Sequence, residues 1–219
     1  MTQINLYFVR HGQTQLNSYK RIQGWADSDL TEKGVKDAEN AADLLSQLKF
    51  DAAYSSDTKR ASRTARIILK QNPADLFEPI QRKALREENF GYFEGNDTNQ
   101  VWNMIGGPHG VNTYSDMIKK FSMEKTRDMI AAADPYHDAE DNEAFWNRVQ
   151  PGIDAVAQAA KDGDNVLVVA HGSMIRSIVS KFSDIDISEP ILNGSVTKLV
   201  FDGHDYHAKF YNHVTDLNE

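Results

Sequence analysis

Ile4-Asn5-Leu6-Tyr7-Phe8-Val9 is a short, mostly apolar run, and Arg10-His11-Gly12 follows it directly. Runs of this length and composition are typical of buried strands in a parallel sheet. Ligands bind just outside the carboxyl ends of strands in open α/β sheets, so we expect Arg10 and His11 at a binding edge. A histidine there can act as a nucleophile, a base or a metal ligand, and the planar donors of the arginine match phosphate oxygens.

The same pattern occurs a second time near the other end of the chain. Val166-Leu167-Val168-Val169-Ala170 is another apolar run, and His171-Gly172 follows it. A single histidine at a strand end is more often structural than functional. Two matching units so far apart in the sequence predict that their strands lie close together in one parallel sheet. Both histidines would then share one pocket.

Helices alternate with these strands. Apolar residues at helical spacing predict a helix that begins after an N-cap at Thr31 and runs to about Leu48. A second helix is expected over 57–70, capped by Ser55-Ser56-Asp57, and a third over 173–182. Helices between strands are typical of parallel sheets that have both faces covered.

Further extended segments complete the pattern. Residues 52–54 and 78–85 are predicted as strands, and the tail from 196 to 211 as a β-hairpin. Strands that alternate with helices predict a three-layer α/β/α fold with a mostly parallel central sheet. Residues 96–161 carry no strand pattern. We therefore predict a single domain, 1–219, in which 96–161 form a mainly helical cap insertion.

The composition excludes several function classes. The net charge of −8 argues against general binding to nucleic acid or to anionic membranes. The chain has no cysteine, which excludes disulfides, thiol nucleophiles and cysteine-based zinc sites. It also has no apolar stretch of about 18 residues and no signal-peptide pattern, so we expect a cytoplasmic protein without membrane contact.

Two further segments bring charged residues to the same predicted sheet edge. Arg60 falls in the first turn of the helix over 57–70, where the helix N-terminus itself favours anions. The acidic stretch Arg86-Glu87-Glu88 lies in a loop after the third extended segment. Two histidines, two arginines and a carboxylate suit phosphoryl transfer without a metal. A neutral imidazole would attack phosphorus, guanidinium groups would stabilise its oxygens, and a carboxylic acid would protonate the leaving alkoxide.

Arg10-His11-Gly12-Gln13-Thr14, together with Asn17, resembles the signature of the histidine phosphatase superfamily, which includes the cofactor-dependent phosphoglycerate mutases. The resemblance extends over essentially the whole chain. Other segments typical of the family follow in the family's order: Gln23-Gly24, Leu30 to Gly34, Ser55 to Ala65, Leu85 to Gly95 and Ala170-His171-Gly172.

The resemblance implies a role for each matching position. His11 would be the phosphorylated nucleophile and Glu87 the proton donor. The remaining positions would bind the phosphate or line the substrate side: Arg10, Asn17, Gln23, Gly24, Arg60, His171 and Gly172. The family needs no metal, so we expect no metal and no cofactor, except 2,3-bisphosphoglycerate if the protein is a mutase. The expected partner is a small phosphorylated metabolite, bound by a monomer or homodimer.

Several other charged residues have simpler interpretations. Glu88 and Glu94 compete with Glu87 for the acid role, and either could face solvent. Arg176 is expected to anchor its helix through an ion pair. The histidines of the predicted hairpin are expected to be exposed polar residues rather than metal ligands: His204, His207 and His213.

The residues after Glu87 separate a phosphatase from a mutase. Mutases of this family follow the proton donor with Arg-His-Tyr and carry an Arg-Arg pair in the insertion. Here Glu88-Asn89-Phe90 follow Glu87, and a second anionic group on the substrate would depend on Lys20 or Arg21. We therefore predict a phosphatase that hydrolyses small phosphomonoesters through a phosphohistidine. The alternative is a 2,3-bisphosphoglycerate-dependent phosphoglycerate mutase.

Two other function classes stay open at this point. A metal-dependent hydrolase could use His11, His171 and Glu87 as ligands. A catalytically silent binding module is less favoured, because all the groups that phosphoryl transfer needs are present. Resistance of the activity to EDTA would separate the first class from a phosphohistidine enzyme.

Overall fold

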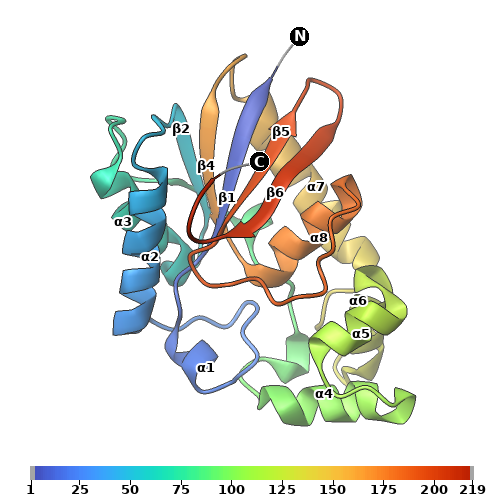
Figure 1. Ribbon diagram of the computed structural model, residues 1–219. Coiled ribbons are helices and arrows are strands. Elements are labelled where there is room, and N and C mark those ends of the chain that lie inside the picture. The colour runs from blue at the N-terminus through green and yellow to red at the C-terminus, as the bar shows by residue number, and fades with distance from the viewer. Residues whose placement is uncertain (1–2, 218–219) are drawn as a thin grey trace.

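A six-stranded sheet forms the centre of the computed structural model, which describes residues 3–217. The strand order is β3-β2-β4-β1-β5-β6 (Figure 1). The strands are β1 (Ile4–Arg10), β2 (Ala52–Ser56), β3 (Ile80–Arg82), β4 (Asn165–Ala170), β5 (Val196–Phe201) and β6 (Tyr206–His213). The first four are parallel to their neighbours among themselves, whereas β5 pairs with β1 and β6 in the antiparallel sense. The predicted mostly parallel sheet is confirmed, as is the C-terminal hairpin.

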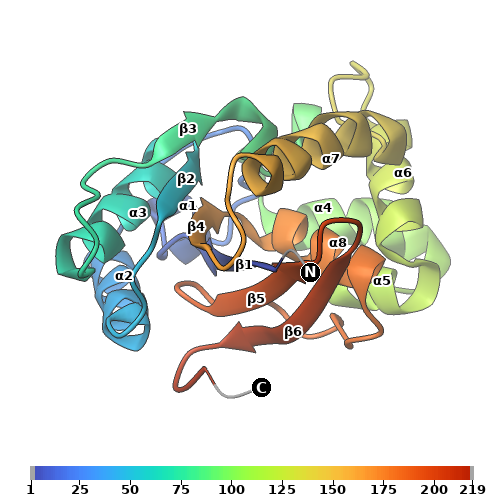
Figure 2. The ribbon, with the colours of Figure 1, turned by 90° about the horizontal axis from the view of Figure 1, so that it is seen from above.

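Successive side chains of a strand point to opposite sides of the sheet, and helices cover both sides. Tyr7 and Val9 of β1 pack with α2 (Glu32–Leu45) and α3 (Lys59–Gln71) on one face. Leu6 and Phe8 pack on the other face with α7 (Asn142–Gln158) and α8 (Gly172–Phe182). The two views show these helix pairs on opposite sides of the strands (Figures 1 and 2). The predicted three-layer α/β/α fold is confirmed.

A group of helices lies below the carboxyl ends of the parallel strands (Figure 1). It consists of α4 (Thr98–Gly106), α5 (Tyr114–Phe121) and α6 (Met123–Ala133), and the short α1 (Gln15–Ser18) lies nearby. Three 3₁₀ turns connect elements in this half of the chain: Lys83–Leu85, Gly91–Phe93 and Gly107–His109. The helices α4 to α6 share an apolar cluster of their own, built from Trp102, Met117 and Ile130 with Phe90 and Phe93.

Three boundaries differ from the sequence prediction. The helix after Thr31 ends at Leu45 rather than Leu48. Ser55 and Ser56 are buried residues of β2, so α3 has Thr58 as its N-cap residue. The third extended segment is a strand only over 80–82, because the chain turns into the 3₁₀ turn that buries Leu85.

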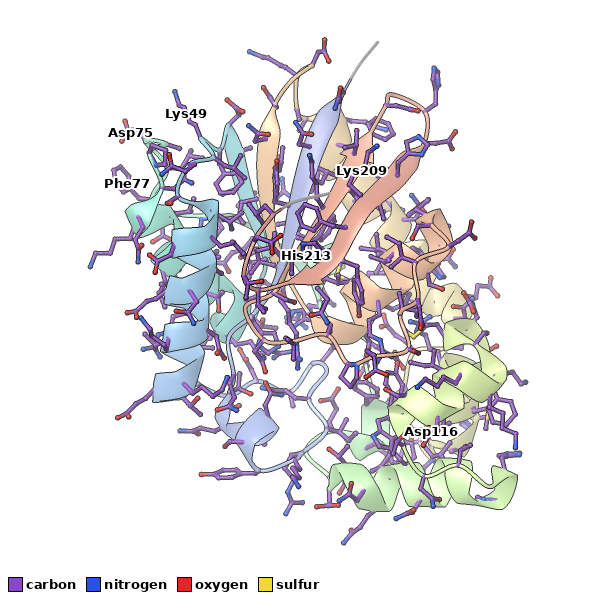
Figure 3. The ribbon with its side chains drawn as sticks, viewed as in Figure 1. Lys49, Asp75, Phe77, Asp116, Lys209 and His213 are labelled. Atoms are coloured by element: carbon purple, nitrogen blue, oxygen red, sulfur yellow. The ribbon has the colours of Figure 1, made fainter. Side chains whose placement is uncertain are left out.

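Some large apolar side chains are exposed on the surface. Phe77, in the loop after α3, is 73% exposed (Figure 3). Among residues 3–217, no helix is both long enough and apolar enough to cross a membrane.

The loop after β1 is held by a close crossing of two backbones. A Cβ on Gly34 would lie 1.9 Å from the carbonyl oxygen of Gln13, and a Cβ on Gly12 would lie 2.0 Å from the carbonyl oxygen of Gly34. The backbone N–H of Thr31 donates to the same Gln13 carbonyl at 3.0 Å. The start of α2 therefore fixes the backbone next to His11, and only glycine fits at the crossing.

We expect Gly34→Ala to lower the free energy of unfolding by about 1–3 kcal/mol, because the new methyl group forces two backbones apart. Urea denaturation of both proteins measures this difference. The matched control is Gly107→Ala, where a Cβ would meet nothing closer than 3.9 Å. Equal loss of stability in the two variants would contradict the close-crossing argument.

Candidate active site

The parallel pairing of β1 with β4 brings the two strand-end histidines together. Arg10 is the register partner of Ala170, and the backbone N–H of His11 donates to the Ala170 carbonyl at 3.1 Å. The ring centroids of His11 and His171 lie 5.2 Å apart at an interplanar angle of 62°. Both side chains are buried. The structure therefore brings the two predicted histidines into one place.

Hydrogen bonds fix which nitrogen of His11 carries the proton. Nδ1 lies 2.8 Å from the carbonyl oxygen of Gly12, which can only accept, so Nδ1 is the protonated nitrogen. Nε2 accepts a hydrogen bond from Nε of Arg60 at 3.2 Å. Burial, helped by the charges of Arg60 and Arg10, holds the pKa of His11 well below its usual value of 6.5. The ring is neutral, with its lone pair on Nε2.

Arg60 is almost fully buried in the first turn of α3, and backbone oxygens surround its guanidinium group. Nη2 donates to the carbonyl of Gly24 at 2.7 Å, and Nη1 donates to the carbonyl of Ala26 at 2.8 Å. Nη1 also forms an ion pair with Asp27 at 3.0 Å. Gly24, which the resemblance assigned to the substrate side, thus lies behind Arg60 and orients it.

Glu87 caps the N-terminus of α8 from another part of the chain. Its Oε2 accepts from the backbone N–H of Ser173 at 2.9 Å, and its Oε1 accepts from Met174 at 2.9 Å and from Glu88 at 3.0 Å. Burial raises the pKa of Glu87 above its usual 4.5, although these donors and Arg60 oppose that shift. Glu87 is therefore a buried carboxyl group that can hold a proton.

His171 is the N-cap residue of α8, but its side chain caps nothing. Within residues 3–217, neither ring nitrogen has a hydrogen-bond partner, although both atoms are buried. Burial, followed by the charge of Arg60, keeps its pKa well below 6.5. A buried polar group without a partner is costly in a folded protein, so its lone pair and N–H are available to a ligand.

Arg148 and Trp25 hold the backbone of Glu87 in place. Nη2 of Arg148 donates to the Glu87 carbonyl at 3.1 Å, and the indole N–H of Trp25 donates to it at 3.0 Å. Arg148 in turn makes a bidentate pair with Glu140, at 2.6 and 2.7 Å. Trp25 and the Glu140–Arg148 pair come from two segments far apart in the sequence, and both fix the backbone of Glu87.

Glu88 and Glu94, the two competitors for the acid role, have other partners. Glu94 accepts from four backbone N–H groups, those of Gly24, Trp25, Ala26 and Phe90. Glu88 is fully buried and pairs with Arg127 at 3.3 Å. From the sequence, either residue could face solvent, but both carboxylates bind protein groups instead. Of Glu87, Glu88 and Glu94, only Glu87 lines the cavity described next.

A cavity of about 390 Å³ opens beside these groups. Its walls include five of the predicted site residues: Arg10, Asn17, Gln23, Glu87 and Gly172. Phe90, Trp102 and Tyr114 give it an aromatic side, and Arg21 and Arg176 add positive charge. Asn17 and Gln23 are linked, because Asn17 Nδ2 donates to Gln23 Oε1 at 3.5 Å.

Two of the simpler interpretations can be checked directly. Arg176 makes no ion pair with the residues that the structure describes. Instead its guanidinium donates to the carbonyls of Ile187, at 3.0 and 2.7 Å, and of Ser188, at 3.2 Å. Backbone oxygens therefore take the role of the expected ion-pair partner, and the neighbouring Asp186 interacts with Arg176 only through its charge.

The hairpin histidines are separate from the site. His207 pairs with Asp202 at 2.9 Å on the surface, and His213 stacks on Phe210 of β6, with ring centroids 4.6 Å apart. Within residues 3–217, no group of three or more histidine or acidic side chains is arranged to hold a metal ion.

Sequence reasoning missed the residues that support the site. Asp27, Trp25 and Glu94 hold Arg60 and its loop, but the loop over 13–29 shows only a polar composition. Arg148 lies on α7, the helix that precedes β4, and its acidic partner Glu140 comes just before that helix, so the sequence does not show that Arg148 reaches the Glu87 carbonyl. Arg127 gave no signal, since an arginine in a polar helix normally faces solvent.

Comparisons with known proteins agree with this geometry. A profile of the histidine phosphatase superfamily (branch 1) matches residues 6–214. The 2,3-bisphosphoglycerate-dependent phosphoglycerate mutase of Streptococcus thermophilus is 32% identical over 203 residues, which cover 85% of this chain and 88% of the relative.

Solved structures extend the similarity to the fold. The crystal structure of phosphoglycerate mutase from Bacillus anthracis matches with a TM-score of 0.91 at 39% identity, over 98% of this chain and 95% of that one. The alpha-ribazole phosphatase from Shigella flexneri shares the fold, with a TM-score of 0.71 at 23% identity, over 98% and 99% of the two chains. Since the family profile spans nearly the whole sequence, the chain belongs to branch 1 of the histidine phosphatase superfamily.

Proposed function

We propose that this protein is a metal-independent phosphatase that hydrolyses small phosphomonoesters through a phosphohistidine on Nε2 of His11. The observation that carries the proposal is the state of the His11 ring. It is neutral, its proton lies on Nδ1, and its Nε2 lone pair faces the guanidinium group of Arg60. A phosphoryl group that reaches Nε2 is therefore attacked by a neutral nucleophile beside a group that binds its oxygens.

The first step forms a bond between Nε2 and phosphorus and breaks the bond between phosphorus and the ester oxygen. Arg60 and Arg10 stabilise the negative charge on the phosphoryl oxygens. The protonated carboxyl group of Glu87 transfers its proton to the leaving alkoxide, so that a neutral alcohol departs. His171 can donate its single N–H to a phosphoryl oxygen, because no other acceptor in the described residues uses it.

The second step returns the enzyme to its first state. Glu87, now a carboxylate, takes a proton from a water molecule as the water oxygen attacks phosphorus. The bond between phosphorus and Nε2 breaks, inorganic phosphate leaves, and His11 is again neutral. Glu87 has regained its proton, so atoms and charges balance over the cycle.

The side chain of Glu88 points away from the cavity, which supports water as the acceptor of the phosphoryl group. In the mutases of this family a cation follows the proton donor, whereas here the fully buried Glu88 follows it. Its carboxylate pairs with Arg127 and does not line the cavity. The segment after Glu87 thus supplies no positive charge that would hold a phosphorylated acid for return of the phosphoryl group.

A second candidate function is a 2,3-bisphosphoglycerate-dependent phosphoglycerate mutase. Two observations favour it. Relatives with that name are 32% identical, and a phosphoglycerate mutase structure matches at 39% identity. Arg21 and Arg176 also line the cavity and could bind a second anionic group of the substrate.

A substrate panel separates the two functions. We expect release of inorganic phosphate from 3-phosphoglycerate and from sugar and aryl phosphates, with equal rates in the presence of EDTA. Added 2,3-bisphosphoglycerate should not accelerate isomerisation of 3-phosphoglycerate beyond phosphate release. Isomerisation faster than hydrolysis would establish the mutase instead, and loss of activity in EDTA would establish a metal-dependent enzyme.

We expect His11→Ala to abolish turnover and, with it, the acid-labile labelling of the protein by a ³²P-phosphate ester, because the nucleophilic nitrogen is lost. His204→Ala is the matched control, since His204 is an exposed residue of the hairpin turn. Labelling that survives in His11→Ala would refute the nucleophile assignment.

Glu87→Gln should slow transfer of the phosphoryl group from phenyl phosphate to His11, measured in a single turnover, by about 10²–10⁴-fold, and transfer from p-nitrophenyl phosphate far less, because p-nitrophenolate leaves without a proton. For phenyl phosphate, the rate should fall as pH rises through the pKa of Glu87, which lies above 4.5. The acid limb should lie well below pH 6.5, because His11 stays neutral there. Equal slowing of the phosphoryl-transfer step for both esters would argue against a proton donor at this position.

A further inference from the structure

Glu88 and Arg127 form a fully buried ion pair that the proposed chemistry does not use. Oε2 of Glu88 lies 3.3 Å from Nε of Arg127, and both side chains are 0% exposed. The phenol of Tyr114 donates to the same Oε2 at 3.3 Å. The guanidinium group lies 3.7 Å from the ring centroid of Phe145. Buried pairs of this kind often add little stability, so a role beyond packing must be sought in what the pair contacts.

A chain of hydrogen bonds runs from Arg127 to the proposed proton donor. Nη2 of Arg127 donates to Oγ of Ser177 at 2.6 Å, and this hydroxyl donates to the carbonyl of Ser173 at 2.8 Å. The same peptide unit carries the N–H of Met174, which donates to Oε1 of Glu87 at 2.9 Å. Hydrogen bonds in series polarise one another, so a positive charge at Arg127 strengthens the donor that faces Glu87.

That chain favours the ionised form of Glu87, which is the form that cannot donate a proton. Arg127 is always charged. A neighbouring carboxylate that neutralises it weakens its influence along the chain. Glu88 provides this carboxylate next to Glu87 in sequence, and its own backbone N–H donates to Oε1 of Glu87.

We propose that Glu88 is a positioning residue that, by neutralising Arg127, keeps the proton on Glu87. The role of that proton rests on the proposed phosphatase activity, whereas the electrostatic coupling does not. Burial raises the pKa of Glu88 to about 7, so the pair itself changes charge near neutral pH. The coupling therefore acts most strongly above that pH, where Glu88 is ionised and the proton on Glu87 is easiest to lose.

Other charged groups also face the two carboxyls and stay unchanged in the test. Glu87 is influenced by Arg60 of α3 and by Arg10 of β1. Glu88 is influenced by Arg127, by Glu87 itself, by Glu140 and by Tyr114. Glu88→Gln also removes the direct repulsion between the two carboxyl groups, whereas Ser177→Ala leaves both carboxyl groups and Arg127 in place and therefore tests the hydrogen-bond chain alone.

The test is a ¹³C NMR titration of the Glu87 carboxyl group in glutamate-labelled protein, assigned by its absence in Glu87→Gln. We expect Glu88→Gln to lower the pKa of Glu87 by about one unit, because Arg127 is left without its counter-charge. Ser177→Ala keeps the ion pair but breaks the chain, so it should raise the pKa. The double variant Glu88→Gln with Arg127→Gln should titrate close to the unaltered protein.

If the pKa of Glu87 falls in Glu88→Gln and rises in Ser177→Ala, the coupling is supported. A purely structural role would shift the pKa of Glu87 in the same direction in both variants, or in neither variant. Kinetics add a second readout. Glu88→Gln should shift the basic limb for phenyl phosphate to lower pH and leave p-nitrophenyl phosphate unchanged. If Glu88→Gln does not fold, the titration of Ser177→Ala alone decides whether the hydrogen-bond chain lowers the pKa of Glu87. Unchanged titration of Glu87 would overturn the inference, whereas absence of turnover in the unaltered protein would count only against the phosphatase activity.

Discussion

The pairing of β1 with β4 is the constraint on which the site depends. Parallel neighbours place their carboxyl ends at one edge of the sheet. Here the register puts Arg10 opposite Ala170, so each histidine stands one residue beyond the last pair. A shift of one residue would turn every side chain of a strand to the other face. The alternation of apolar side chains toward two helical layers thus holds the two histidine rings 5.2 Å apart.

Much of this could be predicted from the sequence, because the strands carry a strong pattern. The runs that precede His11 and His171 are mostly apolar and each leads into a His-Gly pair, so both strand identity and convergence could be predicted. Arg60 could be placed because its helix begins directly after a strand. The supports of the site could not be predicted. Glu94 and Arg148 act on backbone groups, which every residue carries, so their partners leave no mark in the sequence.

Buried positive charge is used in two different ways around the site. The guanidinium of Arg60 is held mainly by carbonyl oxygens, with one partly exposed carboxylate, and Arg10 donates to the carbonyl of Ile191. Carbonyl dipoles hold an arginine without cancelling its charge, so these two remain attractive to a phosphate. Arg127 is instead matched by the full charge of Glu88. The fold therefore keeps positive charge beside His11, the proposed nucleophile, and pairs it with a carboxylate beside Glu87, the proposed proton donor.

The same distinction bears on the acceptor of the phosphoryl group. Fold similarity is shared with both mutases and phosphatases, so it does not choose between them. The choice depends on charge in the cavity beyond the phosphate. Arg176 lies there, yet it already holds the 187–188 segment through carbonyl oxygens, and carbonyls leave its charge uncancelled. Glu88 contributes nothing to the cavity because Arg127 draws it into the core. A substrate acid could therefore interact with Arg176 and Arg21 but would lack a cation directly after Glu87, and this difference in charge is what the proposed phosphatase activity rests on.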